Sequence, residues 1–588
     1  MDAFVDEPGQ APGRIGHHVR MLADVLSAAG ALATAGEEGP GDERALAPAT
    51  LRTLAARAFL TGEWGSSVDS RLSEACTVLG LAARNARALR DGGIGEWFSS
   101  AWAAWGEARA SLLAPQLFDP RILASDAPAG GVPVIPLDVV EAVSEWLARQ
   151  ECDGTPRVLD LTAGTGSIAS ALLTKLQASG RYSGDDLLAG LRLVEADRER
   201  LEIACVIVAR ALERSSAHSP AEVLRRVRAC AVAGSAIDWS AATDEQFDLV
   251  VGTTPLGPGD DSGARPGSQE NDPSPRYLDI LCDRVAEDGF GTLTALSAVV
   301  TAPLGAFAVA RDRLLERFKT TAFLTFDHAP VPLLGSADGA SRTIVRVGRS
   351  GIGQVTTTPV MRCSPEGRRV ALTDAPRTML HQTPPFGRHT FVPRIGSDVE
   401  RRLVDAVIVQ GTARWKGFRV QLTHGEHRAD DDVLSVGATA RDSFSIALRE
   451  PRIHFGEPPT ASARFGVRPA EPELGDAALA VLVTRTAFWW WRASGDGLHV
   501  RREHVTEPLS WLRLLTPEEL ELGFRVAAAW RAGALATAGG GYGQGYAGAD
   551  EAERSRLTWA FDEVLLSHLG ATEDGAREFL SRKSLVDI

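Results

Sequence analysis

The feature that most constrains the fold is a regular alternation of short apolar runs and helical patterns between residues 156 and 318. The stretch RVLDLTAGTGSIASALLTKL indicates a strand, a glycine loop and a helix, and LRLVEADRERLEIACVIVARAL indicates a strand, an acidic tip and a helix. FDLVV and GTLTALSAVV add two further strands, each followed or preceded by a helical pattern. Strands that alternate with helices in this way predict an α/β fold with a doubly wound, mostly parallel sheet.

Ligands of such sheets bind at the carboxyl ends of the strands, so the residues that follow each strand are the candidates for a site. In DLTAGTG, Asp160 ends a strand, and Gly164 and Gly166 allow the backbone to approach a ligand closely. A dinucleotide is one candidate, because Gly164, Gly166 and Ala169 satisfy GxGxxA. The next strand-end acid, Glu195, however lies 29 residues after Gly166 instead of about 20. S-adenosylmethionine is the second candidate, with Glu195 binding the ribose hydroxyls.

Four segments occur in an order that resembles the adenine-N6 DNA methyltransferases of restriction–modification systems, both type I modification subunits and type IIG-like enzymes. They are GVPVIP (Gly131 to Pro136), DLTAGTG, VEADRERLEIA and AEDGFGTLTALSAVV. TAFWWWRASGDGLHVRREHVTEPL is similar to a stretch of the target-recognition parts of that family. The resemblance implies a Rossmann-like S-adenosylmethionine-dependent methyltransferase core, an N-terminal helical domain and a C-terminal α+β region that resembles a target-recognition domain.

The resemblance also implies a set of cofactor-binding residues, with S-adenosylmethionine as the cofactor. Ser235 stands where the family usually carries an Asp that binds the adenine of the cofactor, and Asp238 is the alternative for this role. Ile135 stands where a Thr is usual. The cofactor-binding candidates are Pro136, Asp160, Thr162, Ala163, Gly164, Gly166, Glu195 and Ser235.

The catalytic loop departs most from the family pattern. In the family, the strand that corresponds to FDLVV leads into Asn-Pro-Pro-Phe or Asn-Pro-Pro-Tyr, which holds an adenine flipped out of the duplex. The Asn carbonyl and the first proline's carbonyl accept the two N–H bonds of the adenine amino group, and the aromatic ring stacks on the base. Here these positions are Thr253, Thr254, Pro255 and Leu256. A threonine hydroxyl is shorter than an amide and leucine has no π-face, so we expect methyl transfer to be very slow or absent.

Two alternatives remain open at this point. The chain could be an active DNA adenine methyltransferase that tolerates TTPL, or a methyltransferase or dinucleotide enzyme acting on a small molecule. The second alternative leaves the long C-terminal half without a role.

Charge gives a mixed indication about partners. A net charge of −14 argues against generic nucleic-acid binding, but residues 377–515 hold 19 Lys plus Arg against 16 Asp plus Glu. Basic residues beside aromatic ones suit a nucleic-acid groove, although an ordinary solvated strand would look similar. The DNA-contact candidates are Arg414, Lys416, Arg419, Arg492, Arg501 and Arg502. The tryptophans of FWWW (Phe488 to Trp491) are predicted to be helix core.

Composition shifts predict four units: a helical domain at 1–128, the core at 129–370, a DNA-binding region at 371–515, and helices with a Gly-rich linker at 516–588. The six cysteines are scattered and no apolar run reaches about 18 residues, so we expect a cytoplasmic protein. The segment HGEH lacks further ligands, so we expect no metal site. No nuclease segment or P-loop is recognisable. The expected partners are therefore double-stranded DNA and a nuclease, motor or specificity subunit of a defence system.

Overall fold

A computed structural model of the chain describes residues 135 and 137–581 with several gaps. The gaps are 256–271, 329–331, 335–340, 364–366, 373–379, 383–390, 412–416, 425–433, 441–442, 449–453, 456–462 and 538–548, with the single residues 165, 214, 352 and 498. The helical domain predicted at 1–128 lies outside the described residues. Within the described ranges, no helix combines the length and apolar character needed to cross a membrane.

The described part of the core is built on one nine-stranded sheet with the order β3-β2-β1-β4-β5-β7-β6-β8-β9. The strands β3, β2, β1, β4 and β5 are parallel neighbours, and β7 is inserted antiparallel between β5 and β6. The expected doubly wound, mostly parallel class is confirmed. The strands are β1 (Val158–Asp160), β2 (Leu191–Glu195), β3 (Ala231–Ala233), β4 (Phe247–Thr253), β5 (Val285–Leu296), β6 (Phe318–Phe326), β7 (Arg342–Ser350), β8 (Gln354–Thr357) and β9 (Leu380–Gln382).

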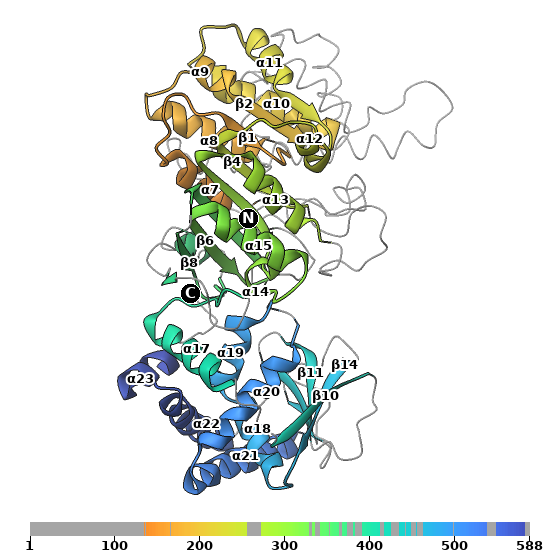
Figure 1. Ribbon diagram of the computed structural model, residues 1–588, viewed down its shortest axis with the longest axis vertical. Helices are drawn as coiled ribbons and strands as arrows, with labels where there is room; N and C mark the ends of the chain where they lie inside the picture. Colours follow the sequence, from red (N-terminus) through yellow and green to blue (C-terminus); the bar gives the residue numbers. More distant parts are fainter. Residues whose placement is uncertain are drawn as a thin grey trace, which may run out of the picture.

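Helices cover both faces of this sheet (Figure 1), which is why strands such as β4 are apolar on both sides. One apolar core lies beneath α7, α8 and α10, and a second lies beneath α13 and α15 on the other face. The helices are α7 (Leu137–Ala148), α8 (Ser167–Ala178), α9 (Gly184–Ala189), α10 (Arg198–Glu213), α11 (Pro220–Ala229), α12 (Ala236–Ala241), α13 (Ser274–Arg284), α14 (Ala298–Thr301) and α15 (Ala306–Arg317).

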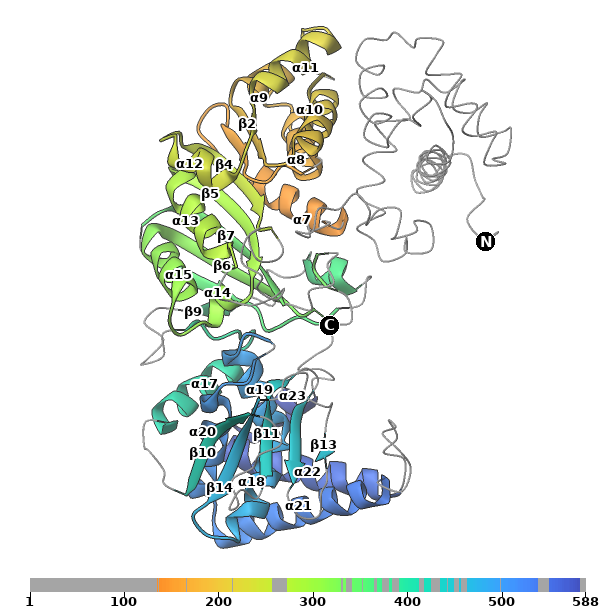
Figure 2. The same cartoon turned by 90° about the vertical axis from the view of Figure 1, so that its right-hand side faces the viewer.

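The C-terminal part forms a second unit, drawn from teal to blue below the core in Figure 1. Its antiparallel sheet has the order β10-β14-β11-β12-β13, and Figure 2 shows these strands as one layer against the helices. The strands are β10 (Phe418–His424), β11 (Leu434–Ala440), β12 (Phe444–Leu448), β13 (His454–Phe455) and β14 (Ala463–Pro469). The helices are α17 (Asp398–Gly411), α18 (Leu474–Leu482), α19 (Arg485–Ser494), α20 (Arg502–Ser510), α21 (Pro517–Thr537), α22 (Ala549–His568) and α23 (Glu573–Ser581).

The second unit has a single apolar core that differs from the predicted division of the chain. Buried residues of α21, α22 and α23, including Val526, Phe561 and Phe579, belong to the same cluster as Val420 of β10. The predicted boundary at residue 515 therefore does not separate two cores. Similarly, β9 adds to the core sheet beyond the predicted boundary at residue 370.

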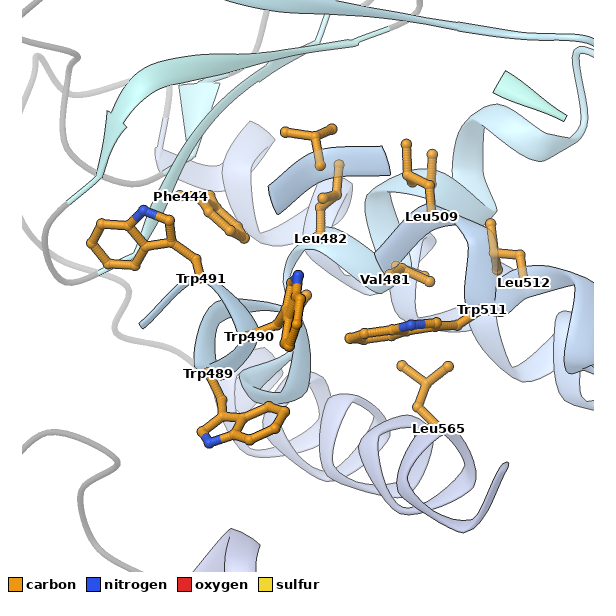
Figure 3. Packing of buried hydrophobic residues seen from close by; sticks show 14 of the residues in the cluster. Phe444, Val481, Leu482, Trp489, Trp490, Trp491, Leu509, Trp511, Leu512 and Leu565 are labelled. Carbon is orange, nitrogen blue, oxygen red and sulfur yellow. The ribbon is translucent and has the colours of Figure 1, made fainter. Parts of the chain in front are cut away.

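Three consecutive tryptophans of α19 lie at the centre of this core (Figure 3). Trp489, Trp490 and Trp491 are all buried. The Trp489 indole N–H donates to the Glu400 carboxylate at 3.0 Å, and the Trp491 indole N–H donates to the His499 carbonyl at 3.0 Å. The prediction that FWWW is helix core is confirmed, because three buried tryptophan side chains are not available to stack on a base.

Candidate cofactor and substrate site

The predicted site residues from three strands come together at one edge of the core sheet. Strand β1 lies between β2 and β4, with Asp160 beside Leu193 on one side and Val251 on the other. Because these strands are parallel, the residues that follow each of them share the carboxyl edge. Asp160, Glu195 and Thr253 therefore stand at neighbouring strand ends, as the sequence predicted.

The glycine loop between β1 and α8 has a conformation that requires glycine. Gly164 and Gly166 have φ angles of 53° and 84°, in the left-handed region. A Cβ on Gly166 would lie 2.9 Å from the Cα of Ala204 in α10, too close for any side chain. The loop therefore packs its backbone directly on α10, and α8 begins immediately afterwards at Ser167.

Asp160 is a buried acid beneath this loop. Burial, together with the nearby charge of Glu195, raises the pKa of its carboxyl to about 7. Backbone hydrogen bonds from Thr162 and Ala169 oppose this rise in pKa. The Thr162 N–H donates to the Asp160 carboxylate at 3.2 Å. The Asp160 carboxylate is thus hydrogen-bonded to the start of the glycine loop and to the first turn of α8.

Glu195 holds the glycine loop from the neighbouring strand end. Its carboxylate accepts the backbone N–H of Gly164 at 2.9 Å and that of Asp197 at 3.0 Å. A carboxylate has about four acceptor positions, so two remain for ligand hydroxyls. Ser235 begins α12, and its hydroxyl accepts the N–H of Ile237 at 3.2 Å, while Asp238 is exposed on the same helix.

Three of the four catalytic-loop positions are described. Thr253 and Thr254 are 3% and 0% exposed, and Pro255 is half-buried. The Thr253 N–H donates to the Thr162 hydroxyl at 2.7 Å, and the Thr253 hydroxyl has no partner among the described residues. The Thr254 hydroxyl accepts a hydrogen bond from Ser274 at 3.2 Å, and the Ser274 hydroxyl accepts the N–H of Leu296 at 3.2 Å. The two threonine hydroxyls are therefore turned into the protein.

Two residues of this site were not expected from the sequence. Ser274, at the first turn of α13, has no sequence signal because it follows a long polar segment and only the fold brings it to Thr254. Tyr277 of α13 is buried nearby. Burial, with a smaller contribution from the charge of Glu195, raises the pKa of its hydroxyl to about 12.

Several predicted residues lie elsewhere or outside the described parts. Ala163 is buried, and its N–H donates to the Val194 carbonyl at 2.9 Å, so it ties the loop to β2. Arg419 and Arg502 are exposed on the second unit. Pro136, Leu256, Arg414 and Lys416 lie outside the described residues.

Arg492 is buried and Arg501 is half-buried, and both lie at the junction between the two units. Arg492 is 5% exposed, and its guanidinium lies 3.0 Å from the carboxylate of Asp327, which follows β6. Arg501 donates to the Ser494 carbonyl at 2.8 Å and to the Thr301 carbonyl at 3.3 Å. This placement does not present either side chain to a phosphate backbone, in contrast to the expectation from the sequence.

The junction attaches the end of α19 to the carboxyl edge of the core sheet. The Ser297 hydroxyl, at the end of β5, donates to the Asp496 carbonyl at 2.8 Å, and the Arg394 N–H donates to the Ala493 carbonyl at 3.0 Å. Burial alone would raise the pKa of Asp327, but its hydrogen bond to His328 and the charge of Arg492 outweigh burial and hold that pKa well below its usual value.

The described residues contain no group of three or more His, Cys, Asp or Glu side chains placed to hold a metal ion. The described cysteines, Cys152, Cys205, Cys230, Cys282 and Cys363, are free thiols.

Comparison with known proteins gave matches only among solved structures. No family model and no curated protein matches the chain. One similar structure is the ATP-dependent type ISP restriction–modification enzyme LlaBIII bound to DNA, with 10% identity, a TM-score of 0.42, and coverage of 87% of this chain and 49% of that one. The chain thus spans about half the length of LlaBIII.

Two further structures have comparable scores. The DrdV–DNA complex has 11% identity and a TM-score of 0.47, with coverage of 89% of this chain and 72% of that one. The methyltransferase subunit of a type I restriction–modification system from Streptococcus thermophilus has 12% identity and a TM-score of 0.34, with coverage of 58% and 80%. At these identities, function is argued from the site itself.

Proposed function

We propose that the chain is a DNA-binding protein of the adenine-N6 DNA methyltransferase family that has kept the cofactor site and lost ordinary methyl-transfer activity. Its role would be DNA recognition in a restriction–modification or phage-defence assembly whose nuclease, motor or specificity subunit is another chain. The observation that carries the proposal is the pair of buried threonines at the end of β4, beside an intact glycine loop and acid.

The residues present fit S-adenosylmethionine. Glu195 retains acceptor positions for ribose hydroxyls, and the left-handed glycines expose the loop backbone to the methionine end of the ligand. Asp238, exposed on α12 next to Ser235, is the candidate for the adenine. When bound, the cofactor would supply an electrophilic methyl group, and the protein residues named here would bind and orient the ligand.

The residues at the catalytic positions are poorly suited to methyl transfer. Activation of an adenine amino group needs a carbonyl acceptor that projects into the base pocket, and removal of such acceptors costs powers of ten in rate. The Thr253 side chain ends in a hydroxyl that is buried, and the Thr254 hydroxyl is held by Ser274. An aromatic platform is missing as well, since Leu256 stands at that position.

Three measurements on the full chain test the proposal. Calorimetric titration should show binding of S-adenosylmethionine, and Glu195→Ala should weaken it. Electrophoretic shifts with duplex DNA should occur at midpoints that rise steeply with salt. Tritiated S-adenosylmethionine should transfer no label to adenine-containing duplexes at an ordinary turnover.

The outcomes separate the alternatives. Rapid labelling of DNA would establish an active adenine methyltransferase and contradict the loss of activity. Cofactor binding without DNA binding would favour a small-molecule enzyme. A Thr253→Asn, Thr254→Pro, Leu256→Tyr variant should gain measurable transfer if the core otherwise retains the pocket, with Thr253→Val as the matched control that restores no acceptor.

A further inference from the structure

A histidine–aspartate pair lies on the short segment between α19 and α20. The Nδ1 atom of His499 lies 2.8 Å from one carboxylate oxygen of Asp496, and the other oxygen accepts the His499 backbone N–H at 2.7 Å. Asp496 thus holds the ring by one nitrogen and leaves Nε2 as the second possible donor. Within the described part of the chain Nε2 has no hydrogen-bond partner, and 47% of the side chain is exposed.

The backbone of this pair is attached to both units. His499 forms an antiparallel bridge with Thr439 near the end of β11, and its carbonyl accepts the Trp491 indole N–H at 3.0 Å. The Asp496 carbonyl accepts the Ser297 hydroxyl of the core at 2.8 Å. Because these contacts use backbone atoms of the pair, the imidazole ring can be replaced without breaking them.

The attachment point lies at the carboxyl edge of the core sheet, next to the candidate site. Strand β5 is the parallel neighbour of β4, with Thr253 beside Thr294, and Ser297 follows the last residue of β5. Neighbouring strands are about 4.8 Å apart. A duplex that brings a base to the end of β4 therefore also passes the end of β5, where Asp496 is attached.

Arginines beneath the pair give the junction an excess of positive charge. Arg394 and Arg492 are 1% and 5% exposed, and Arg501 is half-buried. Among the described residues whose charges act on Arg394, the carboxylates are those of Asp327 and Asp496. Three guanidinium groups thus face two carboxylates before the acids of α20 are counted. The arginines act here through their field, because their guanidinium groups are bound inside the protein.

The charge of His499 depends on pH in a range close to neutrality. Its hydrogen bond to Asp496 raises the pKa of the ring, whereas burial and the charge of Arg501 lower it, and the rise prevails. Arg501 in turn faces Glu503 and Glu507 of α20. Burial raises the pKa of the Glu507 carboxyl to about 7. Protonation of His499 and of Glu507 therefore both make the junction more positive as the pH falls.

We propose that Nε2 of the protonated His499 ring binds a phosphate of the duplex DNA backbone at the junction between the two units. The proposal rests on the proposed function and deepens it, because it names a phosphate contact in place of Arg492 and Arg501. An imidazolium that donates one N–H to a carboxylate can donate the other to a phosphate oxygen, in a charge-assisted hydrogen bond. Such a contact positions the duplex without reading its sequence.

The test uses the full chain and fluorescence anisotropy of a labelled duplex, at about pH 6 and about pH 8.5 and between about 50 and 200 mM salt. At the lower pH, His499→Gln should weaken binding about tenfold and reduce the slope of log affinity against log salt by about 1. At the higher pH it should bind as the unmodified chain does. His499→Arg keeps a cation at both pH values, so it should bind more tightly than the unmodified chain at the higher pH.

Two further variants separate other titrating groups from this contact. In a Glu507→Gln background, the difference between histidine and glutamine at residue 499 should persist, because the Glu507 titration is then absent. The matched control is His568→Gln, since His568 of α22 also lies 3.0 Å from a carboxylate, that of Glu519, and is 29% exposed. Its pH profile and salt slope should equal those of the unmodified chain.

Each outcome decides between the inference and the proposed function. An unchanged pH profile in His499→Gln, or an equal loss of affinity at both pH values, would overturn the inference and leave the proposed function intact. Weaker binding of S-adenosylmethionine by this variant in calorimetry, with unchanged DNA binding, would assign the anion to the cofactor carboxylate and also overturn the inference. Absence of DNA binding by the unmodified chain would instead overturn the proposed function.

Discussion

Replacement of Asp327 by asparagine tests whether the two units are held together by the ion pair at their junction. The change keeps the size of the side chain but removes the charge that faces Arg492 at 3.0 Å. Because Arg492 is 5% exposed, its guanidinium would remain buried without a counter-charge. Breaking a buried pair in this way costs about 3–5 kcal/mol, a large fraction of the 5–15 kcal/mol by which proteins are usually stable.

Urea unfolding of the full chain measures this cost, and the matched control is Asp279→Asn. Asp279 pairs with Arg313 at 2.9 Å, but its side chain is 44% exposed, so solvent screening reduces the pair to at most about 1 kcal/mol. Similar losses for both variants would refute the reasoning. The double variant Asp327→Asn, Arg492→Met should recover most of the loss, because the uncompensated charge is then gone.

The pH dependence follows from the direction of the Asp327 shift. Its pKa in the folded protein is held below that of an unfolded aspartate, which is about 4. The stabilisation is therefore fully present above that unfolded value and is lost as the pH falls through the folded one. Asp327→Asn should flatten the decline of stability in acid, and an unchanged decline would contradict the assignment.

Three further predictions concern the core sheet. Gly166→Ala should destabilise the chain by at least roughly 1–2 kcal/mol and abolish binding of S-adenosylmethionine in calorimetry, because φ is 84° and the new Cβ would meet Ala204. Arg346 is 6% exposed, and among the described residues the Trp146 ring, 5.2 Å from its guanidinium, is the partner of its charge. Arg346→Met should therefore leave the stability measured by urea unfolding unchanged or raise it. A loss above about 3 kcal/mol would contradict this prediction. Burial raises the pKa of Asp160 to about 7, so stability should fall as the pH rises from about 4 to 7, and Asp160→Asn should remove this slope in a pH series of urea midpoints.

The sequence predicted the parts of the fold that depend on local pattern. Alternating apolar and helical segments located β1, β2 and β4, and the glycine loop placed Asp160 and Glu195 at one edge because parallel strands end together. The aromatic run FWWW correctly indicated a core helix. Each strand and helix was predicted from a pattern within a window of about 11–18 residues, where periodicity is informative.

What the sequence could not predict depends on distant partners. Arg492 and Arg501 lie in a basic, aromatic stretch that looks like a phosphate site. In the fold, Arg492 instead pairs with Asp327, which follows β6, and Arg501 donates to the Thr301 carbonyl of α14. Ser274 reaches Thr254 only because α13 returns to the end of β4. The helices after residue 516 share a core with the preceding sheet, although a Gly-rich segment separates α21 from α22 in the sequence.

The contact between Asp327 and Arg492 has a consequence for how such chains can diversify. A recombination event that imports a foreign C-terminal half also imports a new neighbour for Asp327. Only donors with a cation at that point of α19 would give a stable chimera, since an unmatched buried charge is costly. Exchanges confined to the strands from β10 to β14 leave this attachment untouched, because α19 follows them in the chain. Selection could therefore vary the residues of β10 and β14 that lie outside the apolar core while Arg492 stays constant.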